Sequence, residues 1–180
     1  MRHSVLFVLF GVLALTAFAP AQQAMPRIEG ESLAEGKVVL PDAAHGHVAV
    51  LIFGFTKASK EATKAWGDKL LSEFGSQSGF EVYQLPVLEE VPRFIRGMVI
   101  SGIKKGVKEN LRDHFVPILH EEAELKKFVG YHEPDDAYLI VLNSSGQVVR
   151  QLHGSYKVAT YASVRDELRG LLNRRALTVR

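Results

Sequence analysis

The chain has 180 residues, of which 47% are hydrophobic and 23% charged, a balance typical of a single globular domain and unlike that of a disordered chain. Its 22 basic and 20 acidic residues leave a formal net charge of +2, which argues against a nucleic acid partner. The sequence contains no cysteine. Thiol and disulfide chemistry are therefore excluded.

The first residues have the pattern of a signal peptide. Arg2 precedes an almost wholly apolar run over 5–18, and small residues then fit cleavage after Ala21. An uncleaved membrane anchor is the competing interpretation, but the run is shorter than the roughly 20 residues that span a bilayer. We expect residues 1–21 to be removed and the mature protein to be periplasmic or secreted.

Two strands, preceded by a short edge strand or extended segment, are expected in the first half of the chain. Residues 22–46 form a polar lead-in that packs onto the main body, with a short edge strand or extended segment at 37–40. Residues 47–55 are continuously apolar, as in a strand covered on both faces, and predict the central strand. A second strand over 80–88 ends at Pro86.

Apolar residues at helical spacing predict the helices. A helix over 56–75 closes the first strand–helix unit, with Gly75 at its C-cap. A basic helix follows over 90–111, broken at Gly102 or Gly106, and then a short helical segment over 121–128 and an amphipathic helix over 158–175.

A hairpin is expected late in the chain. Residues 138–142 and 148–153 read as two antiparallel strands, with Gly146 in the turn at a position that tolerates positive φ. The order of elements predicts an α/β, thioredoxin-like fold over 47–175: a central mixed sheet flanked by helices, with a helical insertion at about 90–130.

The strand–turn–helix segment 51–62 resembles that of the SCO-type copper chaperones and their redoxin relatives. In that family the turn carries two cysteines, and here Ala58 and Ala62 occupy their positions. The family's later Asp-His pattern meets 134–136, Pro-Asp-Asp, without a matching histidine. The resemblance therefore implies the fold but neither the family's copper binding nor a peroxidase activity, because the donor and nucleophilic atoms are absent.

A second resemblance covers more of the chain. The segment 92–106, the hairpin region 138–146 and the exit at Gly154 are similar to the thioredoxin-like assembly factor for the membrane sector of mitochondrial ATP synthase. That family binds rather than catalyses, so the resemblance implies an assembly or chaperone role for a membrane complex.

The predicted insertion carries an excess of basic residues among its apolar stripe. One interpretation is a surface that faces an acidic partner or a membrane; the other is a core helix whose basic face is merely solvated. The candidate partner-binding residues are Arg93, Arg96, Lys104, Lys105, Lys108 and Arg112.

The turn after the central strand is a degenerate active site. A Lys–Ser nucleophile pair is conceivable there, but no base or oxyanion donor can be placed beside it, and Ser59 is better explained as a helix N-cap. The turn residues in question are Thr56, Lys57, Ala58, Ser59 and Ala62.

Histidines offer another candidate chemistry. His45 and His47 form a His-x-His pattern that could bind zinc or copper, but no third ligand stands at a suitable spacing. We therefore expect no catalytic residue, no metal and no cofactor. The preferred hypothesis is a non-catalytic binding or assembly module of the cell envelope with a protein partner; the alternatives are a metal-binding or redox-related protein and a structural domain without a specific partner.

Overall fold

The computed structural model describes residues 25–178. The predicted signal peptide and its cleavage site lie outside these residues. None of the described helices is long and apolar enough to cross a bilayer. The elements are β1 (Ile28–Glu31), β2 (Lys37–Leu40), the 3-10 helix η1 (Asp42–Ala44), β3 (Val48–Gly54), α1 (Lys60–Phe74), β4 (Phe80–Pro86), α2 (Arg93–Gly106), the 3-10 helix η2 (Glu109–His114), α3 (Glu122–Val129), β5 (Tyr138–Leu142), β6 (Val148–His153) and α4 (Val158–Thr178).

The main sheet is mixed and has the strand order β4-β3-β5-β6. β3 pairs with β4 in parallel and with β5 antiparallel, and β5 continues into the β5–β6 hairpin, whose Gly146 has a φ of 73°. β3 is the central strand, and six of its seven residues are buried, because neighbours cover it on both sides and both faces. The predicted fold class, a mixed sheet flanked by helices, is confirmed.

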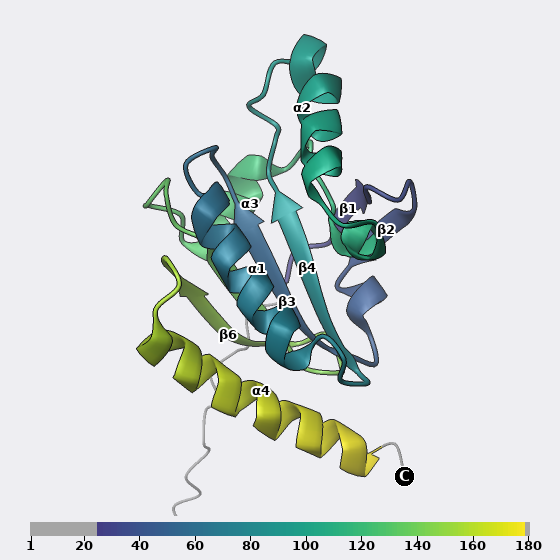
Figure 1. The fold of residues 1–180 in the computed structure, drawn as a ribbon, viewed down its shortest axis with the longest axis vertical. Helices are drawn as coiled ribbons and strands as arrows, with labels where there is room; N and C mark the ends of the chain where they lie inside the picture. Colours follow the sequence, from purple (N-terminus) through teal and green to yellow (C-terminus); the bar gives the residue numbers. More distant parts are fainter. Residues whose placement is uncertain (1–24, 179–180) are drawn as a thin grey trace, which may run out of the picture.

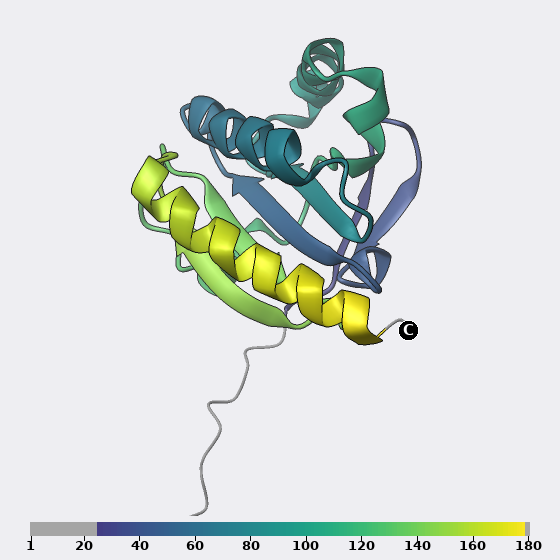
Figure 2. The same cartoon turned by 60° about the horizontal axis from the view of Figure 1, so that its bottom comes forward.

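Two hydrophobic cores lie on opposite faces of the sheet. α1 and α4 lie side by side on one face (Figures 1 and 2), where Trp66, Leu70 and Leu168 are buried against alternate residues of β3 and β5. The other face is covered by the two-stranded β1–β2 sheet, the segment 115–118 and α3. The alternation of β3 side chains between the two cores explains why its sequence is apolar at every position.

β1 was missed by the sequence reasoning, which expected only β2 in this part of the chain. Its sequence, Ile-Glu-Gly-Glu, has one large apolar residue and a glycine, and so lacks the usual strand signal. The glycine is nevertheless required by packing: a Cβ on Gly30 would lie 2.6 Å from Cγ1 of Val116. Tertiary contact, not local preference, therefore places this strand.

A carboxylate links the two helices that cover one face of the sheet. Glu73 of α1 accepts hydrogen bonds from the Tyr161 hydroxyl at 2.6 Å and from the Arg169 guanidinium at 2.9 Å, both from α4. The hydrogen bond from Tyr161 is the main reason that the pKa of Glu73 lies below its ordinary value of 4.5. The folded state thus favours the charged form of Glu73.

We expect Glu73→Gln to lower the melting temperature at neutral pH and to matter progressively less in acid. Because folding depresses the pKa of Glu73, its stabilisation is present above pH 4.5, the ordinary pKa, and is lost as the pH falls through the folded-state pKa. Thermal unfolding of both proteins from about pH 7 down to about pH 2.5 measures this. A melting-temperature difference that stays constant over this range would contradict it.

Candidate functional site

The turn between β3 and α1, residues 55–59, is held by its own hydrogen bonds. Oγ1 of Thr56 accepts hydrogen bonds from the backbone N–H groups of Ala58 at 3.1 Å and Ser59 at 3.3 Å, and it donates to the Pro134 carbonyl at 2.7 Å. This last bond ties the turn to the loop before β5. Thr56 therefore organises the start of α1.

Ser59 is not the capping side chain that the sequence suggested. It stands at the N-cap position of α1, but its side chain makes no capping bond to the helix. Its buried hydroxyl donates instead to the carbonyl of Thr56 at 2.9 Å, while Thr56 accepts from the free N–H groups of the turn.

Ala58 and Ala62 lie in two different environments. Ala58 is exposed at the tip of the turn, between Lys57, which is exposed, and Ser59, which is buried. Ala62 is 7% exposed and belongs to the core cluster that contains Trp66. Methyl groups at both positions leave this turn without a thiol nucleophile or a soft metal donor.

We expect the single variants Ala58→Cys and Ala62→Cys to react very differently with iodoacetamide. A thiol at 58 is exposed, close to the N-terminus of α1 and beside Lys57, so its pKa should fall below the ordinary value of about 8.5. A thiol at 62 should react only when the protein unfolds. Alkylation rates measured against pH test this, with a cysteine peptide as reference; equal rates for the two variants would contradict it.

A histidine–carboxylate pair joins the end of β6 to the loop before β5. His153, the last residue of β6, contacts Asp136 through Nδ1 at 2.7 Å, and its ring lies 4.3 Å from that of His132. Sequence reasoning found no histidine to match 134–136. The β5–β6 ladder supplies one by pairing His153 with Tyr138, 15 residues before it, and no linear spacing signals that pairing.

The second histidine of the His-x-His pattern lies beside a carboxylate. His47 lies 3.6 Å from a carboxylate oxygen of Glu81, which His114 approaches to 3.8 Å from the other side. Burial raises the pKa of Glu81, but contacts with His114, Tyr83 and His47 outweigh it and lower this pKa. Within residues 25–178, no three histidine, aspartate or glutamate side chains are placed to hold a metal ion.

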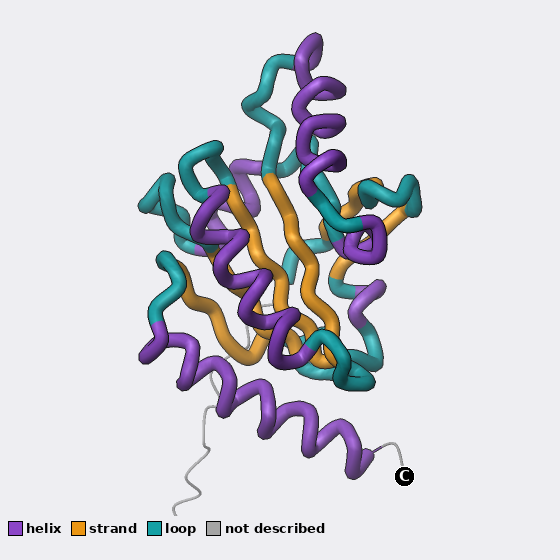
Figure 3. Tube along the Cα trace, viewed as in Figure 1, coloured by secondary structure: helices purple, strands orange, loops and turns teal. Residues whose placement is uncertain are grey.

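α2 projects beyond the end of the sheet (Figure 3), and none of its residues is buried. One side of it is half-buried against the body through residues such as Val99 and Ile100. The opposite side, here called the exposed face of α2, carries Phe94 at 89% exposure and Met98 at 70%. The exposed face also includes Gly97, Ser101, Gly102 and Lys105. The interpretation of this segment as a core helix is therefore wrong.

The six basic candidates fall into two groups. Arg96 donates to the carbonyls of Glu89 and Val91 before α2, Lys104 pairs with Glu35 at 2.9 Å, and Arg112 donates to carbonyls at the end of α2. These three have structural partners within the chain. The other three have no ion pair with any residue that the structure describes: Arg93, Lys105 and Lys108.

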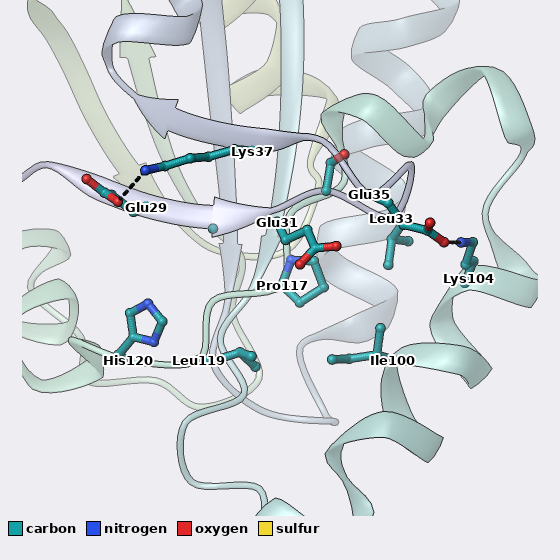
Figure 4. Close-up of a pocket in the computed structure, with 12 residues that line it drawn as sticks. Glu29, Glu31, Leu33, Glu35, Lys37, Ile100, Lys104, Pro117, Leu119 and His120 are labelled. Atoms are coloured by element: carbon teal, nitrogen blue, oxygen red, sulfur yellow. Dashed lines mark hydrogen bonds and ion pairs between the residues drawn. The ribbon is translucent and has the colours of Figure 1, made fainter.

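A groove of about 480 Å³ separates the β1–β2 hairpin from the half-buried side of α2 (Figure 4). Its floor is mostly apolar, and three glutamates stand along its edge. Sequence reasoning missed it because its walls come from three segments that are distant in the chain. The lining residues are Glu29, Gly30, Glu31, Ser32, Leu33, Glu35, Lys37, Ile100, Lys104, Pro117, Leu119 and His120.

The chain matches no protein-family model and no curated protein. Its fold resembles that of BsSco, a member of the Sco family of cytochrome c oxidase assembly proteins, with a TM-score of 0.59, 12% identity and coverage of 86% of this chain and 96% of the other. A protein described as thiol:disulfide interchange protein DsbE of Chlorobium tepidum matches with a TM-score of 0.56 and 15% identity, over 82% of this chain and 94% of the other. An exposed lipoprotein thioredoxin of Streptococcus pneumoniae matches with a TM-score of 0.56 and 13% identity, over 79% of this chain and 100% of the other.

These likenesses confirm a thioredoxin-like fold. At identities of 12 to 15% they concern the fold alone. The chain shares the redoxin architecture of Sco and DsbE proteins without any cysteine. The solved structures named above do not show the resemblance to the ATP synthase assembly factor, which stays a prediction.

Proposed function

We propose that this chain is a non-catalytic binding module of the cell envelope, acting in assembly or as a chaperone, that docks a partner protein on the exposed face of α2. The observation that carries the proposal is the exposure of Phe94 and Met98 on successive turns of a helix with no buried residue. Large apolar side chains that lie together on a surface mark interaction sites.

The β3–α1 turn supports the non-catalytic part of the proposal. Its two alanines replace the thiols that carry chemistry in redoxin relatives, and the hydroxyls of Thr56 and Ser59 are engaged in bonds within the protein. A turn of this kind retains the scaffold and loses the reacting atoms. What remains available for function is binding.

The composition of α2 supports a partner of defined chemistry. α2 contains no acidic residue, and its exposed face combines an aromatic ring and a thioether with small residues. Lys105 on this face, Arg93 at the start of α2 and Lys108 just after its end have no ion pair within the described part of the chain. A partner surface with an apolar centre and an acidic rim is complementary to it.

The comparisons add a weaker argument. BsSco belongs to a family of cytochrome c oxidase assembly proteins, and it resembles this chain in fold. An assembly role on the same scaffold, here without thiols, agrees with the predicted export of the chain.

Photo-crosslinking from the exposed face of α2 tests the proposal. A photoreactive amino acid placed at Met98 should form one dominant adduct with a protein of the source envelope, because the side chain is directed at the partner. Lys157, which is exposed at the start of α4, is the matched control position. Adducts of equal pattern and yield from both positions, or none from Met98, would exclude docking on this face.

A further inference from the structure

The edge of β1 that faces the groove is open. Within residues 25–178, β1 pairs with β2 only, and its register sets Gly30 opposite Val38. The Ser32 N–H donates to the Gly36 carbonyl at 2.8 Å, so Ser32, two residues after Gly30, directs its backbone groups toward the β2 side. Since alternate residues of an antiparallel strand direct their backbone groups to opposite sides, Glu29 and Glu31 direct theirs away from β2.

That open edge lies over the groove. In Figure 4, Lys37 of β2 is on one side of β1, and Leu119, His120 and Ile100 are on the other. A bond from the Leu33 N–H to the Phe115 carbonyl at 2.9 Å closes one end of the groove. Among the described residues, no backbone bond joins Glu29 or Glu31 to the opposite wall.

The two faces of β1 differ in chemistry. Gly30 faces the body, toward Val116 and Pro117, so a neighbouring strand would place its inward side chains on the apolar floor near Leu119 and Ile100. Glu29 and Glu31 alternate with Gly30 and stand on the outer face. Outward side chains of the neighbour would therefore meet carboxylates.

The charges along the groove favour a cationic neighbour. Glu29 is paired with Arg27 and Lys37, and Glu35 with Lys104, whereas Glu31 has no ion pair within the described part of the chain. Opposite charges on directly neighbouring strands stabilise their pairing. An unpaired carboxylate beside an open strand edge is suited to lysine or arginine.

We propose that the open edge of β1 binds an extended segment of a partner protein as an added strand, with apolar side chains in the groove alternating with basic side chains over Glu29 and Glu31. Backbone hydrogen bonds provide the pairing, and the alternation provides the selectivity. The site uses the half-buried side of α2 and is distinct from its exposed face, so this inference does not depend on docking at Phe94 and Met98.

Peptide binding to the whole protein tests this inference. The probe is a fluorescent peptide of alternating lysine and valine, measured by anisotropy, with an alternating glutamate–valine peptide as control. The lysine peptide should bind and shift the backbone amide resonances of Glu29 to Ser32, and the glutamate peptide should not. No binding of the lysine peptide, or amide shifts confined to other elements, would overturn the proposal.

Two further arms separate strand addition from simple charge attraction. Two further lysine peptides carry N-methyl groups at either the odd or the even positions. One of the two should bind more weakly than the parent peptide, by about fivefold per lost hydrogen bond. Glu31→Lys should weaken it roughly fivefold, and Glu31→Pro, which removes the carboxylate together with an outward N–H, should also weaken it. Equal affinities of the methylated and parent peptides, or no effect of Glu31→Lys, would refute the proposal.

The exposed face of α2 supplies the matched control. Phe94→Ser with Met98→Ser leaves the groove intact and should not change the affinity for the peptide. If that double variant loses peptide binding as well, the proposed groove is not the binding site. A failed peptide assay would leave the crosslinking result from Met98 standing, so the two proposals fail separately.

Discussion

Replacing Phe94 and Met98 together by serine is expected to abolish most of the binding of the envelope partner while the fold remains intact. An aromatic hot spot contributes about 2 kcal/mol or more, so affinity should fall by about thirtyfold or more. The two side chains are 89% and 70% exposed, and the free energy of unfolding should therefore stay within about 0.5 kcal/mol of the parent value. Co-purification from the source envelope, together with urea unfolding, measures both effects.

The chain offers a matched control for that experiment. Val158 and Leu177 of α4 are also large, apolar and exposed, at 74% and 76%, but they lie far from each other along their helix. Serine at these two positions should leave partner recovery unchanged. Equal recovery from all three proteins would instead favour a structural domain without a specific partner.

Charge reversal separates the basic residues that are free from those that are structural. Lys105→Glu with Lys108→Glu should weaken partner binding and leave stability unchanged, because neither lysine has an ion pair within the described residues. Lys104→Glu should instead set two carboxylates together at Glu35 and affect the hairpin that lines the groove. The same recovery after either change would argue against an acidic partner.

Trp66→Ala is expected to have the largest effect on stability, a loss of about 3–5 kcal/mol. The ring is fully buried between α1, the sheet and α4, and it packs edge-on against Tyr156 at 5.6 Å. Its Nε1 donates to the Gly154 carbonyl at 2.9 Å, which fixes the exit from β6. Its removal leaves both a cavity and an unsatisfied carbonyl.

Circular dichroism during urea unfolding is the suitable measurement, because Trp66 is the one tryptophan in the sequence and its fluorescence disappears with it. Trp66→Phe is the control. It keeps most of the ring and loses the hydrogen bond, so its cost should be smaller, about 1–2 kcal/mol. A Trp66→Ala protein as stable as the parent would show that this junction does not support the fold.

Much of the fold could be predicted from local patterns. Three features are each a local pattern of a single element: the apolar run of β3, the recurrence of Ala62, Trp66 and Leu70 at every fourth position of α1, and the glycine turn of the β5–β6 hairpin. Such signals survive without tertiary information, because an element must bury its apolar residues on one face or on both. The predicted break at Gly102 or Gly106 falls at Gly106: α2 ends there, Val107 is already extended, and the stripe that continues to Leu111 belongs to two segments.

The candidate site was less accessible from the sequence. Six basic residues were grouped because they are close in the sequence, yet Arg96, Lys104 and Arg112 bind carbonyls or a carboxylate within the chain. A long cation reaches whichever acceptor the fold brings near, and this cannot be read from spacing. Similarly, β1 has almost no strand signal, and the groove beside it exists only where three segments meet.

The amino-acid sequence by itself determined that this protein has no thiol chemistry, since the absence of cysteine needs no structure, and it determined the central strand and the helices through their apolar periods. Only the tertiary structure decided which surfaces are free. Whether Phe94 is buried or exposed, whether Lys104 is paired, and whether the edge of β1 is open depend on what the rest of the chain places beside them. Local preference encodes the element, but exposure is a property of the assembled molecule.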